Sequence, residues 1–376
     1  MNCHHVARRL ARDNRVLYVE SPGLRTPKLS SRRDVGRIGR RLRSWLHQRW
    51  SGPTQITESL HTVAPMIAPF HSSARIERTN RSLLRSAVRR ATKQLGFRDP
   101  VLWSFLPVGS WLLDHGECGI VYHCVDDYAG NPGANPEQIG RQEEMLCKRA
   151  QLIFATSTPL AKRLQTLTET PVVTVPNVAE VEHFAEARTP PEDLAAVPRP
   201  RVGFIGNLAG YKVDVELLRE IAARMPEVEF VLIGPVGSGD PSTSLSAITQ
   251  LANVRSFGAR PYDEVPAYVH GCDVCIIPFR RSPLTDSAFP LKTFEYLAAG
   301  KPVVATPLMS LRDAQLGDDI RFAGGADDFL AALTEALAED DPDAVARRRA
   351  VAQQNSWAIR FPEISSHARA ALPAAT

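Results

Sequence analysis

Short runs of β-branched and apolar residues alternate with segments of helical period along the whole chain of 376 residues. In the first half these runs lie at residues 15–20, 61–65, 101–105, 119–124, 152–156 and 171–175. In the second half they lie at residues 201–205, 229–233, 254–257, 273–278, 302–305 and 320–323. Strands that alternate with helices in this way predict parallel sheets covered by helices. The length suits two cores, so we expect an α/β fold with two Rossmann-like domains.

The two halves are separated by a proline-rich stretch. Residues 188–200 contain four prolines and little hydrophobic periodicity, which is typical of a linker. We therefore expect an amino-terminal domain at residues 1–187, a carboxyl-terminal domain at 201–354 and a closing helix at 355–376 that packs back toward the first domain. The chain opens with a helix-like segment where a Rossmann-like domain normally opens with a strand. This leaves open that a first strand is missing from the sequence.

The composition argues against a membrane-spanning helix, a secretory signal and a zinc site. The content is 44% hydrophobic and 23% charged, and no run approaches the roughly 18 apolar residues of a membrane-spanning helix. The start of the chain is too polar for a secretory signal. Six scattered cysteines fit reduced thiols in the cytoplasm, and the pair Cys272 and Cys275 reads as part of a buried strand rather than a zinc site. We expect a cytoplasmic protein.

Positive charge is concentrated in two amphipathic segments of the first half. Residues 25–49 hold nine Lys or Arg residues and one acid, and residues 75–93 repeat the pattern. Such segments lie on anionic membrane surfaces, although solvated helix faces have the same pattern. A peripheral position at the inner face of the plasma membrane therefore stays open. No motif that reads nucleic acid is present, so nucleic acid is not expected as a partner.

The most specific stretch is TDSAFPLKTFEYLAAGKPVVAT at residues 285–306. Pro290 suits the first turn of a helix, and Gly300 suits its end. Lys292 adds a positive charge to a helix end that attracts phosphate, and Glu295 lies on the same face. A carboxylate there accepts hydrogen bonds from both hydroxyls of a ribose while the lysine holds a diphosphate. The alternative is an exposed i, i+3 ion pair.

This string resembles the donor-site helix of GT-B glycosyltransferases, in particular glycosyltransferase family 4 and its bacterial group 1 members of the polysaccharide and teichuronic-acid type. The resemblance extends through YHCVDDY at 122–128, residues 141–157, VPNVAE at 175–180, PYDEVPAY at 261–268 and SWAIR at 356–360. It implies a GT-B fold, in which two Rossmann-like domains face each other across a cleft. It also implies that the carboxyl-terminal domain binds a nucleotide-sugar.

The sequence departs from the family pattern at three positions. Val178 stands where Gly is usual, Asn207 stands where an Arg follows the Gly turn, and Ser287 replaces the first Glu of the E-x7-E motif of many retaining members. Lys212 is the nearest replacement cation, or else an ordinary loop lysine. Because lysines neutralise a leaving diphosphate and no D-x-D motif is present, no metal or other cofactor is expected. The donor-binding residues expected are Gly206, Asn207, Lys212, Arg260, Ser287, Pro290, Leu291, Lys292, Thr293 and Glu295.

Activation of the acceptor is expected from the first domain. Asp126 and Asp127 follow the strand at 119–124 at its carboxyl end, where α/β folds place ligands. Either one, or His123, is a candidate catalytic base for an inverting displacement. The alternatives are that an aspartate caps the following turn and that His123 packs in the core. In a retaining reaction the departing phosphate accepts the proton, so the stereochemistry stays open.

Taken with the resemblance, the sequence predicts a glycosyltransferase that moves a hexose from a UDP- or GDP-sugar to a hydroxyl acceptor. The basic segments favour a lipid-linked or cell-surface glycan precursor as that acceptor. Three alternatives remain: a transferase acting on a soluble natural product, a nucleotide-sugar 2-epimerase, and a catalytically degenerate protein that only binds nucleotide.

Overall fold

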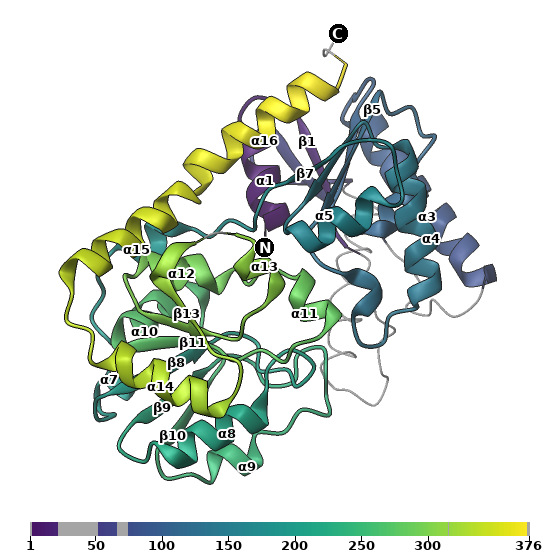
Figure 1. Ribbon diagram of the computed structural model, residues 1–376. Helices are drawn as coiled ribbons and strands as arrows, with labels where there is room; N and C mark the ends of the chain where they lie inside the picture. Colours follow the sequence, from purple (N-terminus) through teal and green to yellow (C-terminus); the bar gives the residue numbers. More distant parts are fainter. Residues whose placement is uncertain (1, 22–51, 66–73, 315, 374–376) are drawn as a thin grey trace. The chain divides into compact units, whose positions relative to one another are not determined.

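The computed structural model describes residues 2–21, 52–65, 74–314 and 316–373 (Figure 1). The chain forms two compact units. Unit 1 consists of Met1–Ala155, Leu160–Thr174 and Glu363–Thr376, and unit 2 consists of Thr156–Pro159 and Val175–Pro362. The main division therefore falls after residue 174 and not at the predicted boundary after 187. Residues 188–200, predicted as a linker, lie inside unit 2, where Leu194 is fully buried.

The described residues of unit 1 form two sheets. The first has the order β1-β3-β2, with β1 parallel to β3 and β2 antiparallel to it; its strands are β1 (Val16–Val19), β2 (Thr54–Gln55) and β3 (Leu60–Val63). The second is parallel throughout, with the order β4-β5-β6-β7; its strands are β4 (Val101–Ser104), β5 (Gly119–Cys124), β6 (Leu152–Ala155) and β7 (Val172–Thr174). Every residue of β5 is buried, as is typical of a central strand of a parallel sheet.

Helices accompany these sheets. They are α1 (Asn2–Leu10), α3 (Ala74–Gln94), η1 (Pro107–Leu112), η2 (Tyr128–Gly130), α4 (Pro136–Arg149) and α5 (Thr158–Gln165). The basic segment at 75–93 lies in α3, whereas the one at 25–49 lies outside the described residues. Within the described part of the chain, no helix is long and apolar enough to span a bilayer.

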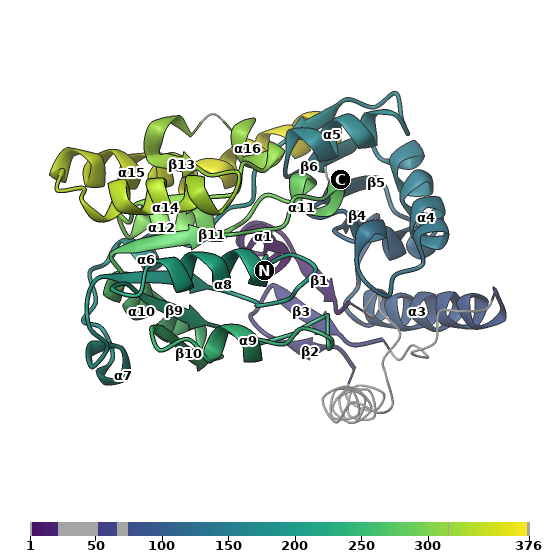
Figure 2. The same ribbon diagram turned by 60° about the horizontal axis from the view of Figure 1, so that its bottom comes forward.

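Unit 2 is built on one six-stranded parallel sheet with the order β10-β9-β8-β11-β12-β13. Figure 2 labels its strands β9, β10, β11 and β13. Its strands are β8 (Arg201–Ile205), β9 (Glu229–Ile233), β10 (Val254–Gly258), β11 (Val274–Ile277), β12 (Val303–Ala305) and β13 (Ile320–Phe322). In sequence order this is the 3-2-1-4-5-6 arrangement of the Rossmann fold. The direction of winding reverses between β8 and β11, and ligands of such sheets bind beyond the carboxyl ends of the strands at this point.

Helices cover both faces of this sheet. They are α6 (Val181–Ala185), α7 (Glu192–Ala195), α8 (Val215–Arg224), α9 (Ser246–Thr249), η3 (Tyr262–Glu264), α10 (Val265–Gly271), α11 (Pro283–Ser287), α12 (Lys292–Ala298), α13 (Met309–Arg312), η4 (Gly317–Asp319), α14 (Ala326–Leu337) and α15 (Pro342–Gln354). The last helix, α16 (Trp357–Ala371), begins in unit 2 and ends in unit 1.

Side chains alternate between two cores along the strands of unit 2. On β8, Val202 and Phe204 join a core beneath α8 and α14, whereas Ile205 joins the core beneath α10 and α12. Cys272 and Cys275 are buried free thiols of the second core, as their apolar surroundings predicted. The alternation places a side chain near the end of β8 on each face of the sheet, next to the point where the winding reverses.

Candidate functional site

Three glycines mark the carboxyl ends of β8, β9 and β10. Gly206, Gly234 and Gly258 have φ angles of 147°, 141° and 68°, which side chains rarely tolerate. The N–H of Gly206 donates to the carbonyl of Ile233 at 2.8 Å. A Cβ atom on Gly234 would lie 1.9 Å from the carbonyl oxygen of Gly206. The turns after β8 and β9 therefore pack backbone against backbone, which is possible only without side chains.

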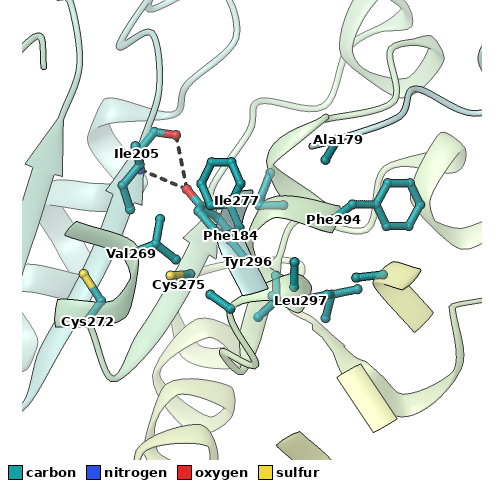
Figure 3. Packing of buried hydrophobic residues seen from close by; sticks show 14 of the residues in the cluster. Ala179, Phe184, Ile205, Val269, Cys272, Cys275, Ile277, Phe294, Tyr296 and Leu297 are labelled. Atoms are coloured by element: carbon teal, nitrogen blue, oxygen red, sulfur yellow. Dashed lines mark hydrogen bonds between the residues drawn. The ribbon is translucent and has the colours of Figure 1, made fainter. Parts of the chain in front are cut away.

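Hydrogen bonds of a tyrosine hydroxyl join helix α12 directly to the end of β8. The hydroxyl of Tyr296 accepts a hydrogen bond from the N–H of Ile205 at 2.9 Å and lies 3.2 Å from the carbonyl of the same residue (Figure 3). The helix begins at Lys292, and Pro290 lies just before its N-cap residue Leu291, with its carbonyl accepting from the N–H of Thr293 at 3.1 Å. The helix ends at Ala298, and Gly300, with φ 75°, follows the C-cap residue Ala299, as predicted. The start of α12 is thus held beside the end of β8.

The Lys292 side chain reaches from α12 to the turn after β8. Its Nζ lies 3.8 Å from the ring centroid of Phe204 and 5.0 Å from that of Phe279. A Cβ atom on Gly206 would lie only 2.6 Å from the same Nζ. The structure therefore brings together Lys292 and Gly206, two of the residues predicted to bind the donor.

Lys292, Glu295 and Lys212 influence one another electrostatically, and we call them the donor cluster. Burial lowers the pKa of Lys292 to about 7; the charge of Glu295 opposes this change and that of Lys212 adds to it. Burial raises the pKa of Glu295 to about 7, against the effect of the Lys292 charge. A bound anion would favour the charged form of the lysine. The donor cluster therefore suits an anionic ligand that carries hydrogen-bond donors for a carboxylate.

Backbone pairing explains how Lys212 comes near Lys292. Val213 forms an antiparallel bridge with Phe279, just beyond β11. The N–H of Arg280 donates to the carbonyl of Lys212 at 2.8 Å. The loop after β8 is therefore hydrogen-bonded to the segment after β11, at the point where the winding of the sheet reverses.

The loop before α12 is held by polar contacts. The carbonyl of Ser287 accepts from the hydroxyl of Ser157, and the Ser287 hydroxyl donates to the carbonyl of Leu284 at 3.0 Å. Asn177 donates from its amide to the carbonyl of Phe289 at 2.9 Å. Ser287, which replaces the expected Glu, is buried and uses its hydroxyl locally. These contacts fix the approach to Pro290 and Leu291.

Of the residues predicted to bind the donor, Asn207 and Arg260 make hydrogen bonds within the protein, and Thr293 is buried. The side-chain amide of Asn207 donates to the carbonyl of Ser238 at 2.7 Å and accepts from its N–H at 3.2 Å. Arg260 donates to the hydroxyl of Tyr268 at 2.6 Å and pairs with Asp193 at 2.7 Å. The hydroxyl of Thr293 is fully buried and makes no hydrogen bond to any described residue. Donor binding by these three residues stays a prediction.

His123 lies inside an aromatic cluster of unit 1. Its ring centroid is 4.9 Å from that of Phe105 and 5.1 Å from that of Phe154. Burial lowers the pKa of His123 to about 3, so the imidazole is neutral at physiological pH. This environment favours the packed-core alternative for His123 over a role as catalytic base.

Asp126 and Asp127 lie in the turn beyond β5 and are half-buried. The N–H of Asp127 donates to Oδ1 of Asp126 at 3.0 Å. Asp127 occupies the N-cap position of η2, but its carboxylate makes no capping hydrogen bond. The structure therefore places both carboxylates at the carboxyl end of β5, as expected, and their catalytic role stays a prediction.

Comparison with known proteins agrees with this geometry. The family model described as "Glycosyl transferases group 1" matches residues 199–340, which include the whole donor cluster. A curated protein of Bacillus subtilis (strain 168), TuaH, whose name assigns it to teichuronic acid biosynthesis as a glycosyltransferase, is 30% identical over 265 residues. Residues 199–340 of the chain are thus similar to the group 1 glycosyltransferases. The alignment with TuaH takes in 66% of this chain and 66% of the relative, slightly less than two thirds of each.

Solved structures of other proteins share the fold at low sequence identity. Sucrose-phosphate synthase from Thermosynechococcus elongatus matches with a TM-score of 0.66 at 14% identity, over 94% of this chain and 98% of that one. HepE from Anabaena, solved with UDP-glucose, matches with a TM-score of 0.64 at 16% identity, over 83% and 86%. The predicted α/β fold class of GT-B type is thus confirmed.

The sequence did not point to four residues near the donor cluster, namely Phe204, Phe279, Tyr262 and Glu180. Phe204 and Phe279 read as ordinary core positions in the strand pattern. Tyr262 makes a side-chain hydrogen bond to Glu180; partial burial, followed by the charges of Glu295 and Glu180, raises the pKa of Tyr262. Glu180 and Tyr262 both stand in stretches that resemble the family, which was the available signal.

An ion pair in unit 1 between the buried Glu143 and the half-buried Arg163 was also missed. Glu143, on α4, accepts hydrogen bonds from the Tyr122 hydroxyl at 2.6 Å and from two nitrogens of Arg163 on α5. The Cys124 thiol donates to the carbonyl of Asp126 at 3.3 Å. This network lies directly beneath the turn that carries Asp126 and Asp127. No spacing rule connects residues on two different helices, so the sequence offered no signal.

Proposed function

We propose that this protein is a group 1 glycosyltransferase that transfers a hexose from a UDP-sugar to a hydroxyl acceptor. The observation that carries the proposal is the donor cluster. The Lys292 ammonium lies beside the Gly206 turn at the reversal of the sheet, with Glu295 one helical turn further on. Such an arrangement suits a diphosphate next to a ribose.

Each part of the donor has a counterpart in this proposal. Lys292 and Lys212 neutralise the diphosphate, whose negative charge grows as the bond to the sugar breaks. Glu295 accepts hydrogen bonds from the ribose hydroxyls. Because two lysines supply the positive charge, the reaction proposed here requires no metal ion. Solved relatives carry UDP-glucose or UDP-2-fluoro glucose, which supports UDP over GDP as the nucleotide.

The proposed acceptor is a cell-surface glycan precursor, handled in the cytoplasm at the membrane. The name of TuaH, which assigns it to teichuronic acid biosynthesis, supports a glycan acceptor. Helix α3 supports the membrane, because it carries seven Lys or Arg residues and one Glu, and Arg75, Arg78, Arg89, Arg90 and Lys93 are exposed. The proton of the acceptor hydroxyl is taken by Asp126 or Asp127 in an inverting reaction.

Calorimetry with UDP-, GDP- and dTDP-sugars tests the donor assignment. We expect tightest binding of a UDP-sugar and loss of at least tenfold in affinity in Lys292→Ala and in Glu295→Ala, because charge-assisted hydrogen bonds are each worth roughly 1.5–3 kcal/mol. Glu335→Ala, an exposed change on α14, serves as the control and should bind normally. Unchanged affinity in both cluster variants would remove the assignment.

Cosedimentation with vesicles tests the membrane assignment. The protein should bind vesicles rich in phosphatidylserine and not neutral ones, and binding should weaken at high salt. Replacing Arg89, Arg90 and Lys93 with Gln should reduce binding at least tenfold, since each basic residue contributes about 1 kcal/mol near an anionic surface. Absence of binding to either kind of vesicle would favour a soluble acceptor instead.

A further inference from the structure

We propose that Phe204 and Phe279 form an aromatic seat that positions the ammonium of Lys292 for the donor diphosphate. Both phenylalanines are positioning residues, and the proposal rests on the donor-binding function proposed for Lys292.

The seat is built from the two strands that flank the reversal of the sheet. Phe204 is the penultimate residue of β8, and Phe279 follows β11 by two residues. Their ring centroids lie 6.4 Å apart, and the ring planes are inclined at 61°. Nζ of Lys292 is 3.8 Å from one centroid and 5.0 Å from the other. Two differently oriented π faces therefore meet the same ammonium group.

No carboxylate holds Lys292 in place of the rings. Lys292 makes no ion pair with any residue that the structure describes. An ion pair would restrain the ammonium but would also neutralise it, and an incoming phosphate would have to compete with the carboxylate. Aromatic faces attract the cation through their quadrupole and leave its net charge available. The seat therefore restrains Lys292 without neutralising its positive charge, which remains available to the diphosphate.

The surroundings of the seat explain why restraint is required here. A lysine side chain has four rotatable bonds, and it must reach the narrow space beside Gly206. Phe204 is fully buried, so its ring is a fixed wall. The charged groups whose fields act on Lys292 are Glu295, on its own helix, and Lys212, on the loop paired with Phe279. Lys292 is half-buried, and burial against the rings lowers its pKa to about 7.

The test compares Phe204→Leu with a matched control, Phe230→Leu. Phe230 lies on the neighbouring strand β9, is also fully buried and belongs to the same core as Phe204, but makes no ring contact with Lys292 among the described residues. Calorimetry with UDP-glucose from pH 6.5 to 8.5 gives the dissociation constant and the pH at which affinity begins to fall. Thermal denaturation shows whether the two variants lose similar stability.

We expect Phe204→Leu to raise the dissociation constant for UDP-glucose about tenfold, within the range of a desolvated cation–π contact. The pH at which affinity falls should also move upward, because water enters the space left by the ring and supports the ammonium. Phe230→Leu should change neither quantity by more than about twofold. A purely structural role of Phe204 would not move the pH dependence.

Other outcomes overturn the proposal in distinguishable ways. If wild type binds UDP-glucose but Phe204→Leu and Phe230→Leu behave alike, the seat is wrong and the proposed function stands. If wild type binds no nucleotide-sugar, the proposed function falls, and the seat falls with it. Should Phe204→Leu fail to fold, the half-buried Phe279→Leu decides with the same expected changes, and a wild-type dissociation constant and pH dependence in that variant would refute the seat.

Discussion

The affinity for a UDP-sugar should fall as the pH rises through neutrality. Burial lowers the pKa of Lys292 to about 7, whereas an ordinary lysine titrates near 10.4. In the free protein, the protonated fraction of a group with pKa 7 falls from about 0.76 at pH 6.5 to about 0.03 at pH 8.5. If the bound diphosphate keeps the lysine charged, this change alone raises the dissociation constant roughly 25-fold over this range. Burial raises the pKa of Glu295 to about 7, and its conversion to the carboxylate that binds the ribose offsets about fourfold of this rise. The dissociation constant should therefore rise roughly sixfold, or about 1.1 kcal/mol.

Calorimetry with UDP-glucose at constant ionic strength measures this change, because the diphosphate diester does not titrate in the same range. At pH 7 the proton taken up by Lys292 and the proton released by Glu295 should nearly cancel, whereas at pH 8 binding should take up about 0.8 of a proton. Proton uptake appears as a dependence of the heat on the ionisation enthalpy of the buffer. Two variants isolate the lysine. Lys292→Met should remove the fall in affinity above pH 7. Glu295→Gln should start the fall at lower pH, because the charge of Glu295 raises the pKa of Lys292.

A constant affinity from pH 6.5 to 8.5 without proton uptake would refute this reasoning. So would a Lys292→Met variant that keeps the wild-type pH dependence, because the titrating group would then lie elsewhere.

Three further substitutions test the framework around the site. Gly234→Ala should prevent stable folding of unit 2, because the new Cβ would lie 1.9 Å from the carbonyl oxygen of Gly206, and a wild-type melting temperature would contradict this. Tyr296→Phe should cost about 1–2 kcal/mol in urea unfolding by removing the hydrogen-bonding hydroxyl that fastens α12 to β8, so unchanged stability would argue against that anchor. Glu143→Ala should cost about 1–3 kcal/mol, because the buried Tyr122 hydroxyl loses its acceptor and the half-buried Arg163 loses its partner, and a loss below about 1 kcal/mol would show that water replaces both contacts.

Much of the fold could be predicted because the strands of parallel sheets are continuous apolar runs. The predicted strands at 201–205 and 229–233 coincide with β8 and β9. The division between the units could not be predicted in the same way. Residues 188–200 are rich in proline, yet Leu194 and Val197 pack into a core of unit 2. The proline content of a segment shows that it forms helices poorly. It does not show which distant residues the segment contacts in the folded protein.

The residues of the site also differ in how far the sequence could predict them. Lys292 and Glu295 were predictable because they lie three residues apart on one helix, where spacing determines the face. The aromatic seat was not, because Phe204 and Phe279 stand 75 positions apart and each resembles a core residue. Their relation to Lys292 arises only when β8, β11 and α12 come together. His123 shows the opposite error, since a histidine beside two aspartates suggests a base until its burial is known.

The most direct measurement of the central claim is a crystal structure of the protein with UDP-glucose. The account predicts the diphosphate within hydrogen-bonding distance of Lys292 Nζ, beside the Gly206 turn, with the ribose hydroxyls on the Glu295 carboxylate. A nucleotide bound elsewhere, or one bound at this turn with Lys292 and Glu295 both unengaged, would contradict it.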